Sequence, residues 1–138
     1  MATVFLYVHV IWSTRNREQL LVRPVRFVFF AQLKKQAEEK GIRLLEVNGG
    51  ADHIHLLIQL HPAQNLSQVM RMLRLDSEEW LNGTQLLKGN FEWSDEIIAY
   101  SVSPASLKPV KEFIEKQEEY HQTRTFETEI EVFMKGNR

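Results

Sequence analysis

The stretch from Asp52 to Leu60 is the feature that most limits how this chain can fold. Bulky apolar residues alternate through it with His53, His55, Leu57 and Gln59. Because successive side chains of a strand point to opposite faces, this pattern predicts a β-strand with one apolar face packed on a helix layer. Both histidines then project together from the opposite face, and we expect them to be displayed there rather than buried in the main core.

Segments on the N-terminal side of this strand add further elements. Val4–Trp12 is rich in β-branched and aromatic residues and predicts a strand covered on both faces. A helix is expected from Pro24 to Lys40, with Gly41 just past its end, because proline favours the first helical turn and glycine the residue after the last. A strand over Ile42–Val47 and a tight, left-handed hairpin turn at residues 48–50 follow.

The later elements complete a recognisable order. They are a helix capped by Asn65 and continuing past Trp80, a loop over Asn82–Asn90, a strand over Ile97–Val102, a helix from Ser103 or Ser106 through Gln117 to His121, and a short helix after Thr123. This order predicts an α+β fold, a ferredoxin-like split βαβ sandwich. We expect one domain over residues 1–138, an antiparallel sheet with helices on one face, an extra C-terminal helix, and an open second face.

Composition narrows the class of protein. With 138 residues, 43% of them hydrophobic, the chain suits one packed domain. It has no cysteine, so any metal must be held by His, Asp, Glu, Gln or Asn. The longest apolar runs are too short to span a bilayer. We therefore expect a cytoplasmic protein with no membrane partner.

The charge is unevenly distributed. The net charge of -1 argues against a protein that coats nucleic acid by bulk electrostatics. Residues 1–75, however, carry ten Lys and Arg against five Asp and Glu, a balance of +5. Within this half Arg15, Arg17, Arg71 and Arg74 are candidate contacts to DNA phosphates, with ordinary surface charge as the open alternative.

The two histidines are candidate metal ligands. Residues two apart on one strand lie about 6.6 to 7 Å apart, close enough for two imidazoles to approach one cation. A useful site needs a third ligand, and Gln117 on a later helix is available. Asp52 is placed to orient a histidine as a hydrogen-bond acceptor. Two incidental strand histidines remain the alternative.

Two segments, residues 51–58 around the histidines and residues 110–119 around Gln117, resemble the single-tyrosine transposases of the HUH superfamily, or a REP-associated or domesticated relative of them. The resemblance implies Mg²⁺ or Mn²⁺ held by His53, His55 and Gln117. It also implies a homodimer that cleaves single-stranded DNA with a hairpin, through a 5′-phosphotyrosine link. With three uncharged ligands, the cation would keep most of its charge for the phosphodiester.

The chain departs from this family at the nucleophile. The family places a tyrosine four residues before the glutamine, and that position here is Phe113, which has no hydroxyl. Three accounts stay open: an engineered Tyr→Phe change, a natural relative without the nucleophile, or a displaced nucleophile. Tyr120, two turns further along, and Tyr100, on the preceding strand, are the candidates for displacement.

Other functions also remain open. One is a DNA hairpin-binding or regulatory protein without catalysis, another a metal hydrolase that uses water, and a third a scaffold in which the histidines do nothing. The remaining residues favour structural roles: we expect His9 to be a packed strand histidine, Phe91 and Trp93 to fill a core edge, and Glu46 to be an exposed sheet carboxylate.

Overall fold

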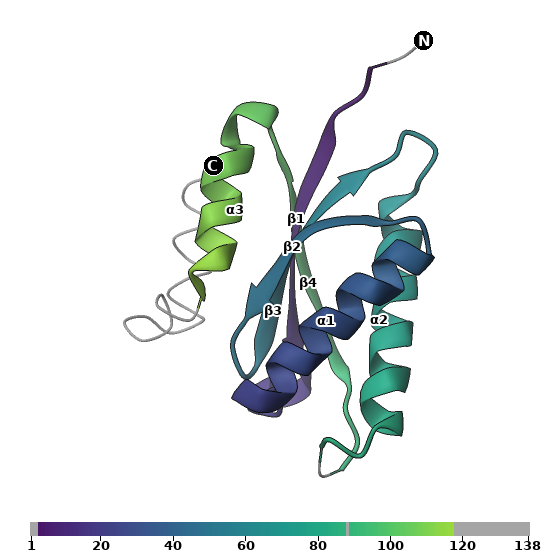
Figure 1. Ribbon diagram of the computed structural model, residues 1–138, viewed down its shortest axis with the longest axis vertical. Helices are drawn as coiled ribbons and strands as arrows, with labels where there is room; N and C mark the ends of the chain where they lie inside the picture. Colours follow the sequence, from purple (N-terminus) through teal and green to yellow (C-terminus); the bar gives the residue numbers. More distant parts are fainter. Residues whose placement is uncertain (1–2, 88, 118–138) are drawn as a thin grey trace.

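The structure of the protein is a computed structural model that describes residues 3–87 and 89–117. It contains a four-stranded sheet in the order β2-β3-β1-β4 (Figure 1). Every neighbouring pair of strands is antiparallel. The elements are β1 (Leu6–Thr14), η1 (Arg15–Arg17), α1 (Arg23–Glu39), β2 (Arg43–Gly49), β3 (His53–Leu60), α2 (Leu66–Gly83), β4 (Trp93–Val102), η2 (Pro104–Ser106) and α3 (Leu107–Glu115). This strand order, with two crossover helices, confirms the ferredoxin-like α+β fold.

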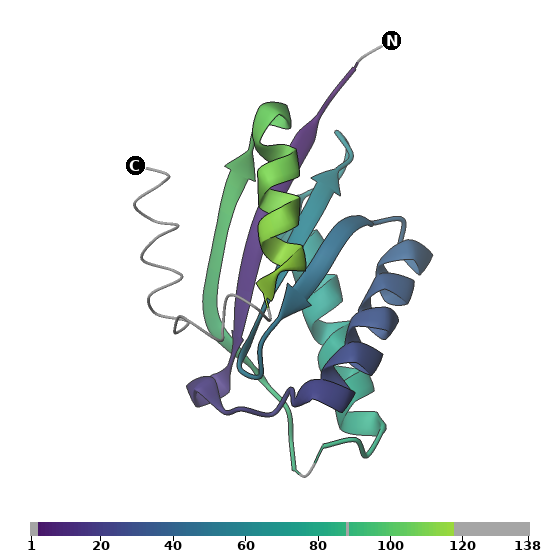
Figure 2. The ribbon, with the colours of Figure 1, turned by 60° about the vertical axis from the view of Figure 1, so that its left-hand side comes forward.

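The helices lie on both sides of the sheet. Helices α1 and α2 cover one face, as expected, while α3 lies against the other face over β2 and β3 (Figures 1 and 2). A small apolar cluster around Leu57, Val102 and Ile114 joins α3 to the sheet. The prediction of an open second face is therefore wrong, because the apolar side of α3 needs a surface on which to bury.

The two faces of β3 belong to two different environments. Ile54, Leu56 and Ile58 are fully buried in the main core beneath α1 and α2. Leu57 points the other way, toward α3. The alternation in the sequence thus has the predicted structural meaning, and it places the histidines on the α3 side.

Local signals at helix ends are confirmed. Pro24 lies in the first turn of α1, and Gly41 follows the end of that helix with a φ of 70°. Asn65 caps α2, its side chain accepting a hydrogen bond from the backbone N–H of Gln68 at 3.3 Å. Across the part of the chain that is described, no helix is both long and apolar enough to cross a membrane.

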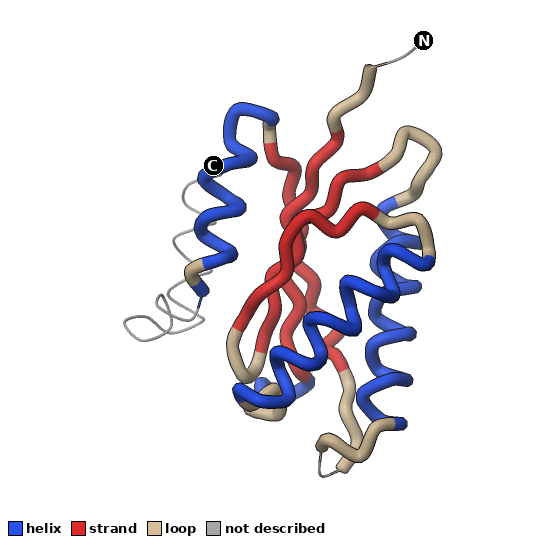
Figure 3. Tube along the Cα trace, in the orientation of Figure 1, coloured by secondary structure: helices blue, strands red, loops and turns tan. Residues whose placement is uncertain are grey.

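Several boundaries differ from the prediction, and β1, for example, runs over Leu6–Thr14 rather than Val4–Trp12 (Figure 3). Strand β4 begins at Trp93 rather than Ile97, because the indole of Trp93 packs edge-on against Trp12 in the core, with ring centroids 5.3 Å apart. Helix α3 ends at Glu115, so Gln117 follows a break at Lys116. Tyr120, and with it His121 and the helix expected after Thr123, lies outside the described residues.

The hairpin between β2 and β3 also differs from the prediction. Asn48 and Gly49 do not form a left-handed turn; they continue β2 and pair with His55 and Ile54. Gly49 is needed for a different reason. A Cβ atom there would collide with the carbonyl oxygen of His53 and lie 2.7 Å from Cα of Ile54.

We therefore predict that Gly49→Ala lowers the free energy of unfolding by about 1 to 3 kcal/mol, as forced overpacking does. The matched control is Gly83→Ala, at the end of α2, where an added Cβ has nothing within 4 Å. Urea unfolding of both variants measures the difference. Equal stabilities for the two variants would show that the β2 and β3 backbones do not approach this closely.

Candidate functional site

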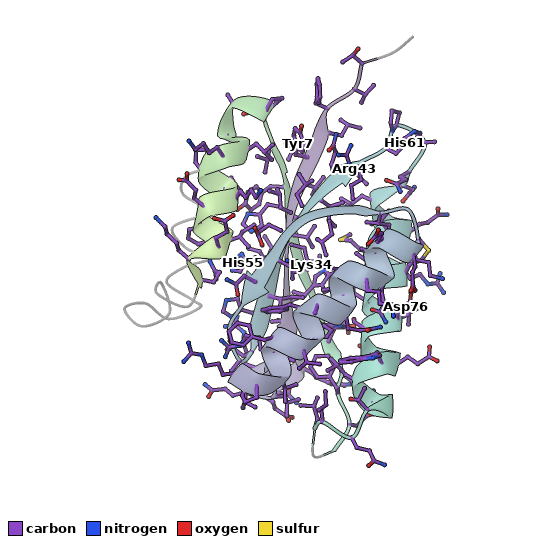
Figure 4. The ribbon with its side chains drawn as sticks, in the orientation of Figure 1. Tyr7, Lys34, Arg43, His55, His61 and Asp76 are labelled. Atoms are coloured by element: carbon purple, nitrogen blue, oxygen red, sulfur yellow. The ribbon has the colours of Figure 1, made fainter. Side chains whose placement is uncertain are left out.

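The histidines of β3 lie in the layer between the sheet and α3, where Figure 4 shows His55. Their ring centroids are 5.2 Å apart, so the strand does bring the two imidazoles together. The expectation that they are displayed is wrong: His53 is 1% exposed and His55 is 0% exposed, because α3 covers their face of the sheet. They form a buried polar pair outside the main apolar core.

Asp52 orients His53 as the sequence suggested. Nδ1 of His53 lies 2.8 Å from a carboxylate oxygen of Asp52. Burial by itself raises the pKa of Asp52, but the hydrogen bond and charge of His53, with the charge of Arg17, outweigh it and hold the pKa below its usual value. An ionised Asp52 accepts a hydrogen from Nδ1, so Nε2 is the atom with which His53 would bind a cation.

His55 is oriented by two residues, His9 and Tyr100, to which the sequence analysis assigned other roles. Nδ1 of His55 lies 2.8 Å from Nε2 of His9, and Nδ1 of His9 lies 2.6 Å from the hydroxyl of Tyr100. His9 is 0% exposed. The expectation that His9 packs within its strand is thus confirmed, but it also has a polar role. Only the register of β1 against β3 and β4, which no local pattern contains, could have revealed it.

Helix α3 brings Phe113 to the histidines. The rings of Phe113 and His55 meet edge to face, with centroids 5.7 Å apart and an angle of 73°. The C-terminal end of α3 is held to β2 by a hydrogen bond of 3.1 Å, which the Asn48 side-chain amide donates to the carbonyl of Glu115. The position expected to carry the nucleophile is therefore in direct contact with one of the expected metal ligands.

Gln117 follows one helical turn after Phe113 and is 0% exposed. Its side-chain N–H donates to the carbonyl oxygen of Phe113 at 3.3 Å. Its amide oxygen is buried and accepts no hydrogen bond from any described residue. A buried amide oxygen of this kind carries a desolvation penalty that a cation would relieve.

These donors fit a divalent cation. Residues 3–87 and 89–117 hold no group of three or more His, Asp or Glu side chains placed to bind a metal. Two buried imidazoles oriented through Nδ1, with one buried amide oxygen, are the donor set that the sequence predicted. Glu46 is half-buried rather than exposed as expected, and burial, with a hydrogen bond to Glu115, raises the pKa of its carboxyl group.

The four candidate arginines do not form one basic surface. Arg15, Arg71 and Arg74 line a cavity of about 710 Å³ between α2 and the start of β4, and Arg17 does not. The same cavity is lined by Glu78, Glu92, Asp95 and Glu96. The mixed charge of this lining makes it a poor site for phosphate by itself.

Two of these arginines already have structural partners. Arg15 forms an ion pair with Glu92. Arg74 donates to the carbonyl of Ser94 at 2.6 Å, and its guanidinium lies 5.4 Å from the ring centroid of Trp12. Phosphate contacts by Arg15 and Arg74 would have to replace or share these interactions.

The aromatic residues near the start of β4 are structural, as expected. Phe91 is 0% exposed and Trp93 is 4% exposed. The indole N–H of Trp93 donates to the hydroxyl of Ser77 at 2.9 Å. Neither ring is accessible for stacking on an unpaired base.

Comparison with known proteins gives a consistent result. The IS200 transposase of Salmonella typhimurium is 32% identical over 66 residues, which are 48% of this chain and 43% of that protein, so the match spans under half of the relative. The ISDra2 transposase TnpA of Deinococcus radiodurans is 26% identical over 114 residues, covering 79% of this chain and 81% of the relative.

Solved structures show the same fold. The crystal structure of a predicted transposase from Deinococcus radiodurans R1 superposes with a TM-score of 0.64 at 24% identity, over 84% of this chain and 93% of the other. A REP-associated tyrosine transposase bound to a REP hairpin also gives 0.64, at 11% identity, over 88% and 73% of the two chains. The family model described as "Transposase IS200 like" matches residues 2–117, and the chain therefore belongs to the IS200-like transposase family.

Proposed function

We propose that this chain binds hairpin-bearing single-stranded DNA ends and that His53, His55 and Gln117 hold a divalent cation, Mg²⁺ or Mn²⁺, at the scissile phosphate. When bound, the cation would supply Lewis-acid polarisation of the phosphodiester. Membership of a transposase family supports DNA as the substrate. The hairpin bound by the REP-associated transposase of the same fold supports the class of DNA.

The observation that carries this proposal is the contact between Phe113 and His55. The aromatic ring lies edge-on to a buried imidazole, with centroids 5.7 Å apart, on the helix that ends two residues before Gln117. A phenol oxygen on the ring of residue 113 would extend from a position already fixed beside the candidate ligands. This contact supports the site that the family resemblance implies, with a phenylalanine at the position expected for the nucleophile.

It follows that the chain as it stands binds DNA ends without becoming covalently attached to them. In this proposal Tyr100 is not the nucleophile, because the whole His9 ring lies between its hydroxyl and His55. Tyr120 lies outside the described residues and is tested directly below.

We predict that Phe113→Tyr creates a covalent adduct with hairpin-bearing single-stranded DNA taken from either side of the encoding gene. The introduced phenol gives up its proton as its oxygen bonds to phosphorus, the bond from phosphorus to the 3′ oxygen breaks, and that oxygen takes up one proton and leaves as a 3′-hydroxyl, so that no net proton is gained or lost. Denaturing gel electrophoresis with labelled DNA and Mn²⁺ measures the adduct. The unaltered chain should reduce the mobility of the DNA on native gels but give no covalent adduct.

Two controls sharpen this experiment. Adding His55→Ala to Phe113→Tyr should abolish the adduct, whereas adding Tyr120→Phe should leave it unchanged. An adduct formed by the unaltered chain and lost in Tyr120→Phe would overturn the missing-nucleophile proposal in favour of a displaced one. Tight DNA binding with no adduct in the folded Phe113→Tyr protein would favour the purely binding function.

The cation site has its own prediction. His53→Ala, His55→Ala and Gln117→Leu should each weaken Mn²⁺ binding by more than about 10-fold, because loss of even an indirect partner of a ligand costs 10-fold to 100-fold. The matched control is His61→Ala, since His61 is exposed and its ring nitrogen only accepts a hydrogen bond from the backbone of Ala63. Electron paramagnetic resonance of free Mn²⁺ gives the affinities; equal values for all four variants would place the cation elsewhere.

A further inference from the structure

A row of polar side chains crosses three strands of the sheet and ends at His55. Tyr100 of β4 lies directly opposite His9 of β1, while His9 and His55 are diagonal neighbours, since His9 pairs with Leu57 and Ile11 pairs with His55. The two hydrogen bonds along the row measure 2.6 and 2.8 Å. The row occupies the face of the sheet that α3 partly covers, outside the main apolar core.

The proton positions along this row are linked. If His55 binds a cation through Nε2, its hydrogen must be on Nδ1, and this N–H donates to Nε2 of His9. His9 then carries its own hydrogen on Nδ1 and donates it to the oxygen of Tyr100. In the reverse arrangement Tyr100 donates to His9, His9 donates to His55, and the hydrogen of His55 occupies Nε2, which blocks a cation there.

Burial makes these bonds costly to lose. His9 and His55 are both 0% exposed, so water cannot readily replace a missing partner. The two histidines of the site are also oriented differently: His53 by the carboxylate of Asp52, and His55 by neutral groups. A neutral partner fixes the ring without adding a second negative charge that would offset the charge of the cation.

We propose that His9 and Tyr100 are positioning residues that hold the His55 ring with its hydrogen on Nδ1 and its Nε2 toward the cation. This inference rests on the proposed cation site. It assigns Tyr100 a role in the site other than that of a nucleophile, and it explains why a buried histidine and a half-buried tyrosine are hydrogen-bonded across neighbouring strands.

The test compares the Mn²⁺ affinities of four variants of the full chain. His9→Phe keeps the ring volume but removes both nitrogens, whereas His9→Gln keeps an acceptor and a donor but loses the ring. Tyr100→Phe removes only the hydroxyl. The matched control is Tyr7→Phe, which removes a phenol hydroxyl two residues before His9 on the same side of β1, where Tyr7 packs against the α3 cluster.

We expect His9→Phe to weaken Mn²⁺ binding by about 10-fold to 100-fold, as loss of a ligand's partner does. His9→Gln should recover most of this loss, Tyr100→Phe should weaken binding by a few fold, and Tyr7→Phe should match the unaltered chain. A purely packing role for His9 gives the opposite order, with His9→Phe close to the unaltered chain and His9→Gln worse. That order would overturn the inference.

Nitrogen-15 NMR of the imidazole rings provides a readout that does not depend on metal affinity. With Mg²⁺, the unaltered chain should show hydrogen on Nδ1 of both His9 and His55, and His9→Phe should lose the single fixed tautomer of His55 in the metal-free protein. A His55 ring that stays fixed in the metal-free His9→Phe protein contradicts the positioning role even if Mn²⁺ binds. Failure of the unaltered chain to bind Mn²⁺ through His53 and His55 instead rejects the cation site itself.

Discussion

The two-sided burial of β3 is the constraint on which the rest of the structure depends. One face of this strand forms the apolar core under α1 and α2, and the other lies in the layer beneath α3 with two imidazoles in it. Buried polar rings must have partners, because each unsatisfied nitrogen costs about 1 to 3 kcal/mol. One partner, Asp52, is adjacent to its histidine in the sequence, and the other, His9, comes from the neighbouring strand. The hydrogen bonds of the candidate site therefore help to make burial of this face of β3 possible.

Much of the fold was predictable from local sequence patterns. The alternation at residues 52–60, the proline at the start of α1 and the asparagine cap of α2 are short-range signals, and each gave the correct element. The order of elements then restricted the topology to the one observed. The spacing of Phe113 and Gln117 predicted one helix for both; Phe113 on α3 does contact His55, whereas Gln117 follows the break at Lys116.

What the sequence missed depends on contacts between distant segments. The hydrogen bonds between Tyr100 and His9 and between His9 and His55 join residues 91 and 46 positions apart, and a one-residue shift in either strand pairing would remove them. The burial of the histidines depends on where α3 packs, which its amphipathic pattern alone does not specify. The same holds for Arg15 and Arg74, whose partners Glu92 and Ser94 lie far along the chain. A charge pattern shows that arginines are present, but not whether they already form ion pairs or hydrogen bonds within the protein.

At residue 113, the packing role of the aromatic ring can be separated from the chemical role of a hydroxyl group. Its ring contributes to the apolar cluster beneath α3 and to the edge contact with His55, and neither requires a hydroxyl. The packing of α3 on the sheet, and with it the burial of both histidines, therefore depends on the ring of residue 113 and not on a hydroxyl. In the proposed site, the contacts that bury the candidate ligands are those of folding, and none of them requires a reacting oxygen at residue 113.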